Sequence, residues 1–483
     1  MSRIALFNRS AGGAVRTAGR VGGRVAFVGL ALLMGLQSAG AAEPYDIDAL
    51  VPARVVQARY FATHLHRLVA VAEPQARVTA WPVGQIGALR LWDSSTRWVD
   101  LEPAPSAFEF DRLDAYVAQA QSQGASLLMV LGSAPRWAAA RPDEPGPYGP
   151  GSAAEPARMA DWERYVAALA RRYKGRIEAY ELWNEPYFSD LPADRDQPGA
   201  FFTGSVATMV ELARRTRAVL DREDPRARLL TPGFVGGVQR FDMFLSAGGG
   251  RHVNGVAYHY YAADDREFIT LHRAVRAVMA RHGVSHLPLY NTESGFGAGD
   301  AAASDARAAP GRAGPAALLA RSMVLGAFLG IDRFYQYAWD NGRSGMLRAG
   351  SPDAGAGAGA DTGGDTGIGA TANANVTAFA AVRRWLLGTT LQTCRLGSDG
   401  IVRCEGRRGA DQLLIAWHAG QASPAPTGVV RLPASAQLVS VDPVIGSKRP
   451  ADPRAVLESG LVVGSDPVAL WWRQAAGAKG PAK

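Results

Sequence analysis

Cysteine and histidine are scarce in this chain, and their scarcity limits the chemistry that it can carry. Among 483 residues there are two cysteines and eight histidines. No histidines and cysteines are grouped at zinc-ligand spacing, so the sequence predicts no metal site. Runs of lysine and arginine interleaved with aromatic residues are also missing, which argues against a nucleic-acid partner.

Acidic residues are absent from the first 41 residues, which carry five arginines. An apolar run at 25–36 follows Arg24, and Ala39-Gly40-Ala41 is typical of a cleavage site. We therefore expect a signal peptide at 1–41 and an exported protein, periplasmic or secreted. The run is shorter than the roughly 18 residues that a spanning helix needs. The alternative, an uncleaved inner-membrane anchor through 25–41, stays open and is the only membrane contact expected.

The remaining chain alternates strand-like and helix-like segments. Hydrophobic residues make up 47% of the sequence and charged residues 20%, so it can bury a core. Helices are predicted at 110–123, 161–173, 206–220, 268–282, 316–329 and 376–387. Strands are predicted at 60–66, 87–92, 126–132, 177–183, 227–231, 255–259, 287–292 and 333–339. Eight strands alternating with helices indicate a parallel (β/α)8 TIM barrel over 60–388, after an N-terminal extension at 42–59.

Short alternating runs replace this pattern after Gly388. They predict a small β-sandwich at 389–475, followed by a flexible tail at 476–483. Cys394 and Cys404 flank a turn-like stretch there, which in an exported protein favours a disulfide, although a reduced pair of core residues is the alternative. Residues 349–375 form a low-complexity loop, either a mobile rim of the active face or an insertion without a role.

Two glutamates follow strand-like segments on the expected active face. Glu185 comes directly before Pro186, which has no N–H and ends the strand ladder. Glu293 comes directly after the seventh predicted strand, at 287–292. Catalytic residues of a (β/α)8 barrel lie at the carboxyl ends of the strands, and a pair of carboxylates there is what glycosidic bond cleavage requires.

The surrounding motifs resemble those of clan A glycoside hydrolases. Trp183-Asn184-Glu185-Pro186 is similar to their acid/base motif, and Thr292-Glu293-Ser294-Gly295 to their nucleophile segment. Together with Arg90-Leu91-Trp92-Asp93 and the trailing β-domain, the chain resembles glycoside hydrolase family 39 over most of 60–390. The resemblance implies a retaining enzyme without cofactor, in which Glu185 is the general acid and then base, and Glu293 is the nucleophile.

The resemblance also implies roles for further residues. Arg90 would lower the pKa of Glu293, and Tyr261 would hydrogen-bond that carboxylate. Asn184 would hydrogen-bond the sugar 2-hydroxyl, His259 would line the same subsite, and Trp339 would form an apolar floor. Aromatic residues that could bind sugars along a cleft are Trp92, Trp98, Trp137, Tyr148 and Phe188. Structural alternatives remain: Arg90 could pair with a structural carboxylate such as Asp93, and the histidine and the aromatic residues could simply pack.

The expected substrate is a bacterial extracellular polysaccharide, cleaved internally during exopolysaccharide biosynthesis or matrix turnover. Exopolysaccharide synthesis or export machinery is the other partner considered. Two alternatives remain open. One is an exo-acting enzyme of the β-xylosidase or iduronidase type, and the other is a non-catalytic glycan-binding protein of an export system. The loops at 141–156, 297–315 and 349–375 would decide between an open groove and a closed pocket.

Overall fold

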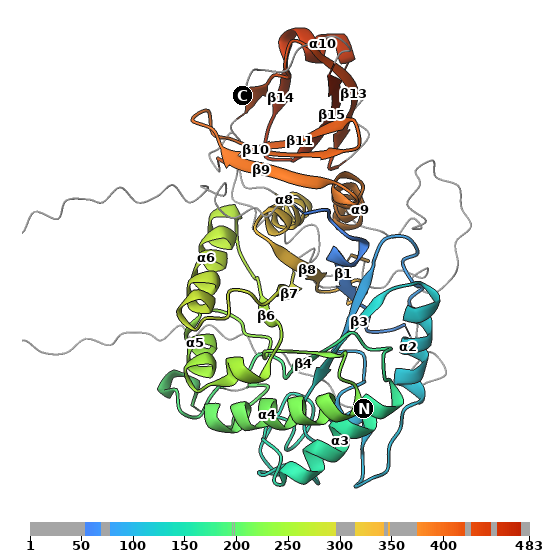
Figure 1. The fold of residues 1–483 in the computed structure, drawn as a ribbon, viewed down its shortest axis with the longest axis vertical. Helices are drawn as coiled ribbons and strands as arrows, with labels where there is room; N and C mark the ends of the chain where they lie inside the picture. The colour runs from blue at the N-terminus through green and yellow to red at the C-terminus, as the bar shows by residue number, and fades with distance from the viewer. Residues whose placement is uncertain are drawn as a thin grey trace, which may run out of the picture. The chain divides into compact units, whose positions relative to one another are not determined.

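Eight short parallel strands form the first sheet of the computed structural model (Figure 1). The structure describes residues 54–68, 78–195, 197, 199–295, 314–341, 346–347, 374–420, 427–445 and 452–474. The predicted signal peptide at 1–41 and tail at 476–483 lie outside these residues, as do residues 297–313 and 349–373 of the loops predicted at 297–315 and 349–375. Within the described segments, no helix is long and apolar enough to cross a membrane.

The strand order β5-β4-β3-β2-β1-β8-β7-β6 is that of a barrel opened between β5 and β6. Two isolated parallel bridges, Leu230 with Gly255 and Phe234 with Tyr258, join those two edges. The strands are β1 (Phe61–His64), β2 (Ala88–Leu91), β3 (Ser126–Leu131), β4 (Ala179–Leu182), β5 (Arg228–Leu230), β6 (Val256–His259), β7 (Leu289–Ser294) and β8 (Ile331–Gln336). The predicted TIM-barrel fold is therefore confirmed.

Helices surround the barrel (Figure 1). They are α2 (Asp111–Ser122), α3 (Met159–Arg172), α4 (Val206–Glu223), α5 (Gln239–Ser246), α6 (Asp265–Arg281), α8 (Pro315–Phe328) and α9 (Ala374–Leu386), with the short α1 (Trp98–Leu101) after β2. Ser205 caps α4 by accepting a hydrogen bond from the Thr208 N–H, and Asp264 caps α6 in the same way from Glu267. These caps satisfy backbone donors that a helix start leaves without partners.

One side chain from each strand fills the inside of the barrel. These eight residues form a buried cluster of their own: Ala62, Ala88, Leu128, Ala179, Leu230, Ala257, Tyr290 and Tyr335. Side chains alternate between the two faces of a strand, so the residue two positions later also points inward. This register decides which side chains reach the carboxyl end of the barrel.

The C-terminal part is antiparallel, as predicted. Its five-stranded sheet has the order β13-β15-β11-β10-β9, and β12 pairs with β14. The elements are β9 (Thr390–Leu396), β10 (Ile401–Arg408), β11 (Asp411–His418), β12 (Gly428–Val430), β13 (Ala436–Pro443), α10 (Pro453–Ser459), β14 (Leu461–Val463) and β15 (Val468–Gln474). The division into domains at residue 388 stays a prediction.

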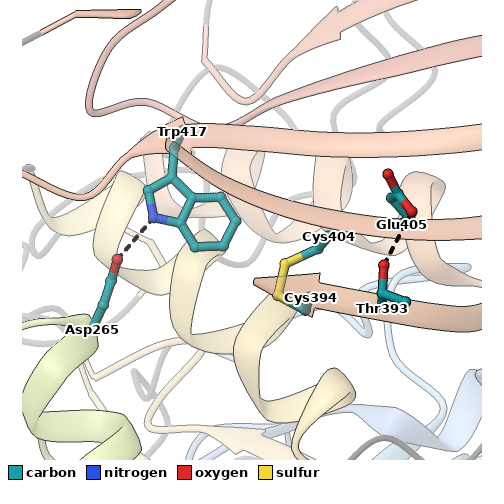
Figure 2. The surroundings of a disulfide bond; sticks show 6 residues. All are labelled: Asp265, Thr393, Cys394, Cys404, Glu405 and Trp417. Atoms are coloured by element: carbon teal, nitrogen blue, oxygen red, sulfur yellow. Dashed lines mark hydrogen bonds between the residues drawn. A yellow bond between two sulfur atoms is a disulfide. The ribbon is translucent and has the colours of Figure 1, made fainter. Parts of the chain in front are cut away.

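A disulfide and a buried hydrogen bond lie where the β-domain meets the barrel (Figure 2). Cys394 of β9 and Cys404 of β10 stand opposite each other, both fully buried, and form the predicted disulfide. The Trp417 indole N–H donates to Asp265 Oδ2 at 2.8 Å. Asp265 begins α6 of the barrel, so this bond ties the two parts together.

Replacing both cysteines by alanine is expected to lower the free energy of unfolding by about 2 to 3 kcal/mol, because the bridge restricts the unfolded chain. Urea titration of the double variant and of the wild type, with and without reductant, measures the effect. Reductant should weaken only the wild type. Equal stability of the oxidised wild type and the variant would show that the bridge does not stabilise the fold.

Candidate active site

A layer of polar side chains lies directly above the apolar interior of the barrel. His64, Arg90, Glu181 and His259 each come two positions after an interior residue of their strand, and all four are fully buried. The strand register therefore turns them inward at the carboxyl end. Buried polar groups of this kind need partners. Arg90 contacts both Glu181 and His259, whereas His64 Nε2 lies 3.1 Å from the Thr292 carbonyl oxygen.

Arg90 is the centre of this layer. Its Nε and Nη2 donate to the two oxygens of Glu181 at 3.0 and 2.7 Å, and its Nη1 donates to Glu293 Oε2 at 2.8 Å. Nη2 also donates to Asn184 Oδ1 at 2.7 Å. Asp93, the alternative partner considered from the sequence, accepts hydrogen bonds from two tyrosines instead. Arg90 thus holds three of the groups at the site in fixed positions.

Glu185 reaches the site through an unusual backbone. Trp183 and Glu185 have φ values of 64° and 38°, a conformation that is costly for residues other than glycine and is concentrated at functional sites. The Glu185 N–H donates to the Gly233 carbonyl at 2.9 Å, which fixes the turn. The left-handed backbone and this hydrogen bond together place the carboxylate at the strand end.

The two glutamates face each other around His259. One oxygen of Glu185, one oxygen of Glu293 and a ring nitrogen of His259 all lie within 4.8 Å of one another. His259 Nδ1 is 2.7 Å from Glu185 Oε1 and 4.0 Å from Glu293 Oε2. The Tyr261 hydroxyl donates to Glu293 Oε1 at 2.6 Å. The predicted residues Glu185, Glu293, Arg90, Asn184, His259 and Tyr261 therefore come together.

The pKa of Glu293 is raised, although the sequence led us to expect that Arg90 would lower it. Burial raises the pKa of Glu293, and the nearby Glu185 adds to this, whereas His259, Arg90 and the Tyr261 hydrogen bond act in the opposite direction. Arg90 thus acts in the expected direction, but burial outweighs it in the free protein. Burial also raises the pKa of Glu181, but Arg90 and His259 outweigh it and hold that pKa below its usual range.

His259 is the cationic partner of these carboxylates at neutral pH. Burial alone would lower its pKa, but Glu293, Glu181 and Glu185 raise it to about 9. An imidazolium that donates from Nδ1 to Glu185 keeps a proton next to that carboxylate. The pair can therefore hold the proton that a general acid needs.

This raised pKa predicts a pH dependence of stability. The pKa of His259 is higher in the folded state than in the unfolded state, where it is about 6.5. Its contribution is therefore fully present below about pH 6.5 and is lost as the pH rises through 9. Between pH 6.5 and 9.5, urea titrations should show the wild type losing about 3 kcal/mol more than His259→Gln. Parallel stability curves for the two proteins would contradict this prediction.

Three predicted aromatic residues lie apart from the hydrogen-bonded cluster. Trp339 is 2% exposed and packs against Phe379 of α9. Trp92 is equally buried and packs edge-on against Tyr148 and Phe201. Trp137 is half-buried beside an open cavity of about 670 Å³. The sugar-binding roles of all three tryptophans stay predictions, and Trp137 is the one of the three that is not fully buried.

Three residues at the site were not predicted from the sequence. Glu181 carries the ion pair to Arg90, and Tyr337 donates to Asp93 at 2.6 Å. Gly233 lies against the cluster, where a Cβ atom would stand 2.3 Å from Glu181 Oε1 and 2.6 Å from His259 Nε2. Two charged residues inside the apolar segment 177–183, Glu178 and Glu181, were the available signal. Nothing in the sequence marks Gly233.

The arrangement of Glu185, His259 and Glu293 also decides whether the site is suited to a metal ion. Glu185, His259 and Glu293 could together offer three ligand atoms to a divalent ion. However, the Arg90 guanidinium already places a positive charge 2.8 Å from Glu293, and His259 would have to lose its proton. The residues therefore fit a pair of carboxylates that works without a metal better than they fit a metal centre.

Comparison with known proteins finds likeness in structure only. No known family model matches the chain, and no curated protein matches it. A family 39 glycoside hydrolase from the gut symbiont Bacteroides cellulosilyticus WH2 aligns over 80% of this chain and 75% of its own, with 18% identity and a TM-score of 0.56. A glucosidase from Croceicoccus marinus covers 86% of this chain and 83% of its own, with 15% identity and a TM-score of 0.53.

A GH30 endoxylanase from Clostridium papyrosolvens C71 is also similar in structure. It covers 88% of this chain and 98% of its own, with 13% identity and a TM-score of 0.54. The structural neighbours thus include glycoside hydrolases of families 39 and 30. At these identities the likeness shows that this chain has the barrel and β-domain fold of those proteins.

Proposed function

We propose that this chain is a retaining glycoside hydrolase with Glu293 as nucleophile and Glu185 as acid and base. The observation that carries the proposal is the approach of the two carboxyl groups to within 4.8 Å. Retaining enzymes hold their carboxyl groups about 5 to 5.5 Å apart, whereas inverting enzymes leave about 6.5 to 9.5 Å for a water molecule. The short separation supports direct attack on the sugar.

In the first step, Glu293 attacks the anomeric carbon and Glu185 protonates the leaving oxygen. Arg90 and Tyr261 each donate to one oxygen of Glu293, which orients the carboxylate for attack. The proton shared between His259 and Glu185 goes to the leaving group. In the second step, Glu185 takes a proton from water, and that water releases the sugar from Glu293 with retained configuration.

Asn184 is positioned to recognise the sugar. Its Oδ1 accepts from Arg90 at 2.7 Å, so the orientation of the amide is fixed and its Nδ2 can donate to a ligand. A hydrogen bond to the 2-hydroxyl strengthens as positive charge develops on the sugar ring. The pairing therefore supports the predicted role of Asn184.

The substrate that we propose is a bacterial extracellular polysaccharide. The signal-peptide pattern at 1–41 supports export, and the motifs resemble those of PslG, a glycosidase of a biofilm exopolysaccharide system. Internal cleavage during polymer synthesis, export or matrix turnover is the proposed reaction. An exo-acting β-xylosidase-like enzyme and a non-catalytic glycan-binding protein of an export system are the alternatives.

Incubation with a panel of purified bacterial exopolysaccharides tests the proposal. The wild type should release new reducing ends and shorten the polymer rapidly in size-exclusion chromatography, whereas Glu293→Gln should do neither. Release of single sugars without early shortening would point to the exo-acting alternative. Polymer binding without any product, for both proteins, would support the non-catalytic alternative and overturn the proposed hydrolase.

A further inference from the structure

A second polar cluster lies beside Glu293. It consists of His64 at the end of β1, Asp93 after β2, Tyr337 after β8, and Tyr148 from the segment between β3 and α3. The Tyr148 hydroxyl donates to Asp93 Oδ1 at 2.5 Å, and the Tyr337 hydroxyl donates to Asp93 Oδ2 at 2.6 Å. Two separate segments therefore converge on the Asp93 carboxylate, and the His64 ring packs against the Tyr337 ring with 5.0 Å between their centroids. We name these four residues the Asp93 cluster.

Backbone contacts place this cluster on either side of the nucleophile. His64 Nε2 is 3.1 Å from the carbonyl oxygen of Thr292, and the Tyr337 N–H donates to the carbonyl oxygen of Ser294 at 2.7 Å. Thr292 and Ser294 are the two chain neighbours of Glu293. The cluster therefore contacts the chain on both sides of Glu293, and the Glu293 charge also helps to raise the pKa of Tyr337, so that the two side chains lie near each other.

The polar atoms that the cluster leaves available are mainly acceptors. His64 Nε2 faces a carbonyl oxygen, which only accepts, so Nε2 carries the hydrogen and Nδ1 keeps its lone pair. Burial holds the pKa of His64 well below its usual range, so the ring is neutral. Within the described chain, this buried Nδ1 has no hydrogen-bond partner. The two tyrosine hydroxyls use their protons on Asp93. The Tyr148 oxygen is also hydrogen-bonded with Arg97, so the Tyr337 oxygen is the better acceptor for a ligand.

Cations near the cluster already have acidic partners. Arg90 is bound by Glu181 and Glu293. Arg97 lies over the Tyr148 ring, 3.7 Å from its centroid, and pairs with Asp100 at 2.7 Å. Among the residues that the structure describes, a carboxylate group on a ligand would therefore face Asp93 without an unpaired arginine to compensate. Burying such a charge near a like charge is costly.

We propose that the Asp93 cluster binds the sugar on the nucleophile side of the scissile bond and selects a neutral, hydroxyl-rich sugar over a uronic acid. Sugar hydroxyls donate to the oxygens of Asp93 and Tyr337, two residues of the cluster that are only partly buried. The negative charge of Asp93 excludes a sugar carboxylate. This inference rests on the proposed function, because Glu293 defines which side of the bond the cluster faces.

Saturation-transfer NMR with free sugars tests the inference without relying on turnover. The probes are glucose with glucuronate, galactose with galacturonate, and mannose with mannuronate. The wild type should bind the neutral member of at least one pair at least 10-fold more tightly than its uronate. Tyr337→Phe should weaken neutral-sugar binding about 10-fold, and Asp93→Asn should reduce the preference against the uronate.

The control variant is Asp143→Asn, which removes an exposed carboxylate from the same segment as Tyr148. It should leave the affinities for the neutral sugars and for the uronates unchanged. Thermal melting should show that all variants are folded. The inference would be overturned if no neutral sugar bound at least 10-fold more tightly than its uronate. It would also be overturned if Asp93→Asn kept the wild-type preference, or if no sugar bound at all. If neutral sugars bind as expected but no polysaccharide is cleaved, only the proposed hydrolase fails.

Discussion

Replacing Glu293 by glutamine is expected to lower kcat/KM by about 10⁴-fold or more while the protein stays folded. The amide keeps the size of the side chain but cannot attack the anomeric carbon. Arg90 retains its bidentate partner Glu181, so the buried guanidinium is not left without a carboxylate. Reducing-end release from a cleaved polysaccharide measures the loss, with thermal melting as the check on folding.

Glu185→Gln should slow the cleavage of a polysaccharide much more than the cleavage of an activated aryl glycoside. Loss of the general acid should reduce polysaccharide cleavage by about 10² to 10⁴-fold. An activated aryl glycoside needs less protonation of its leaving group, so its first step should be slowed far less. The control is Glu458→Gln, which changes an exposed carboxylate on α10 and should leave activity unchanged. Substantial turnover by Glu293→Gln would contradict the assignment of the nucleophile.

Gly233→Ala is expected to lower kcat/KM about 10²-fold and to reduce the free energy of unfolding by about 1 to 3 kcal/mol. The added Cβ would stand 2.3 Å from Glu181 Oε1 and 2.6 Å from His259 Nε2. Neither side chain can move freely, because Arg90 holds Glu181 and Glu185 holds His259. Relieving the overlap therefore displaces the groups that orient both catalytic candidates.

Gly237→Ala is the matched control for this prediction. It lies four residues further along the same segment, and a Cβ there would meet nothing within 4 Å. Activity and urea stability should match those of the wild type. Equal behaviour of the two alanine variants would show that close packing at Gly233 does not position the site.

The fold could be predicted because its signals are local. Each barrel strand is a short apolar segment separated from the next by a helical pattern, and the pattern changes to alternating strands after Gly388. Glu185 was recognisable for the same reason, since the proline after it ends the strand. Sequence reasoning reached Arg90, Asn184, His259 and Tyr261 only through their resemblance to a known family.

Strand register explains why other parts of the site could not be predicted. Pairing of β7 with β8 shifts between Asn291 and Ser294, and pairing of β6 with β7 shifts between Tyr258 and His259. Such irregularities re-aim side chains by one position and leave no reliable mark in a sequence. Burial is likewise a property of the whole fold. For this reason the net direction of the Glu293 pKa could not be foreseen from its arginine neighbour.

In the proposed reaction, Glu293 forms a covalent bond to the sugar while Glu185 assists. Glu185→Gln, treated with an activated aryl glycoside of a neutral sugar that the wild type cleaves, should accumulate a glycosylated protein because its second step lacks a base. Mass spectrometry of the intact protein should show the mass of one added sugar, and peptide mapping should place it on Glu293. A label on another residue, or hydrolysis with inverted configuration, would contradict the account.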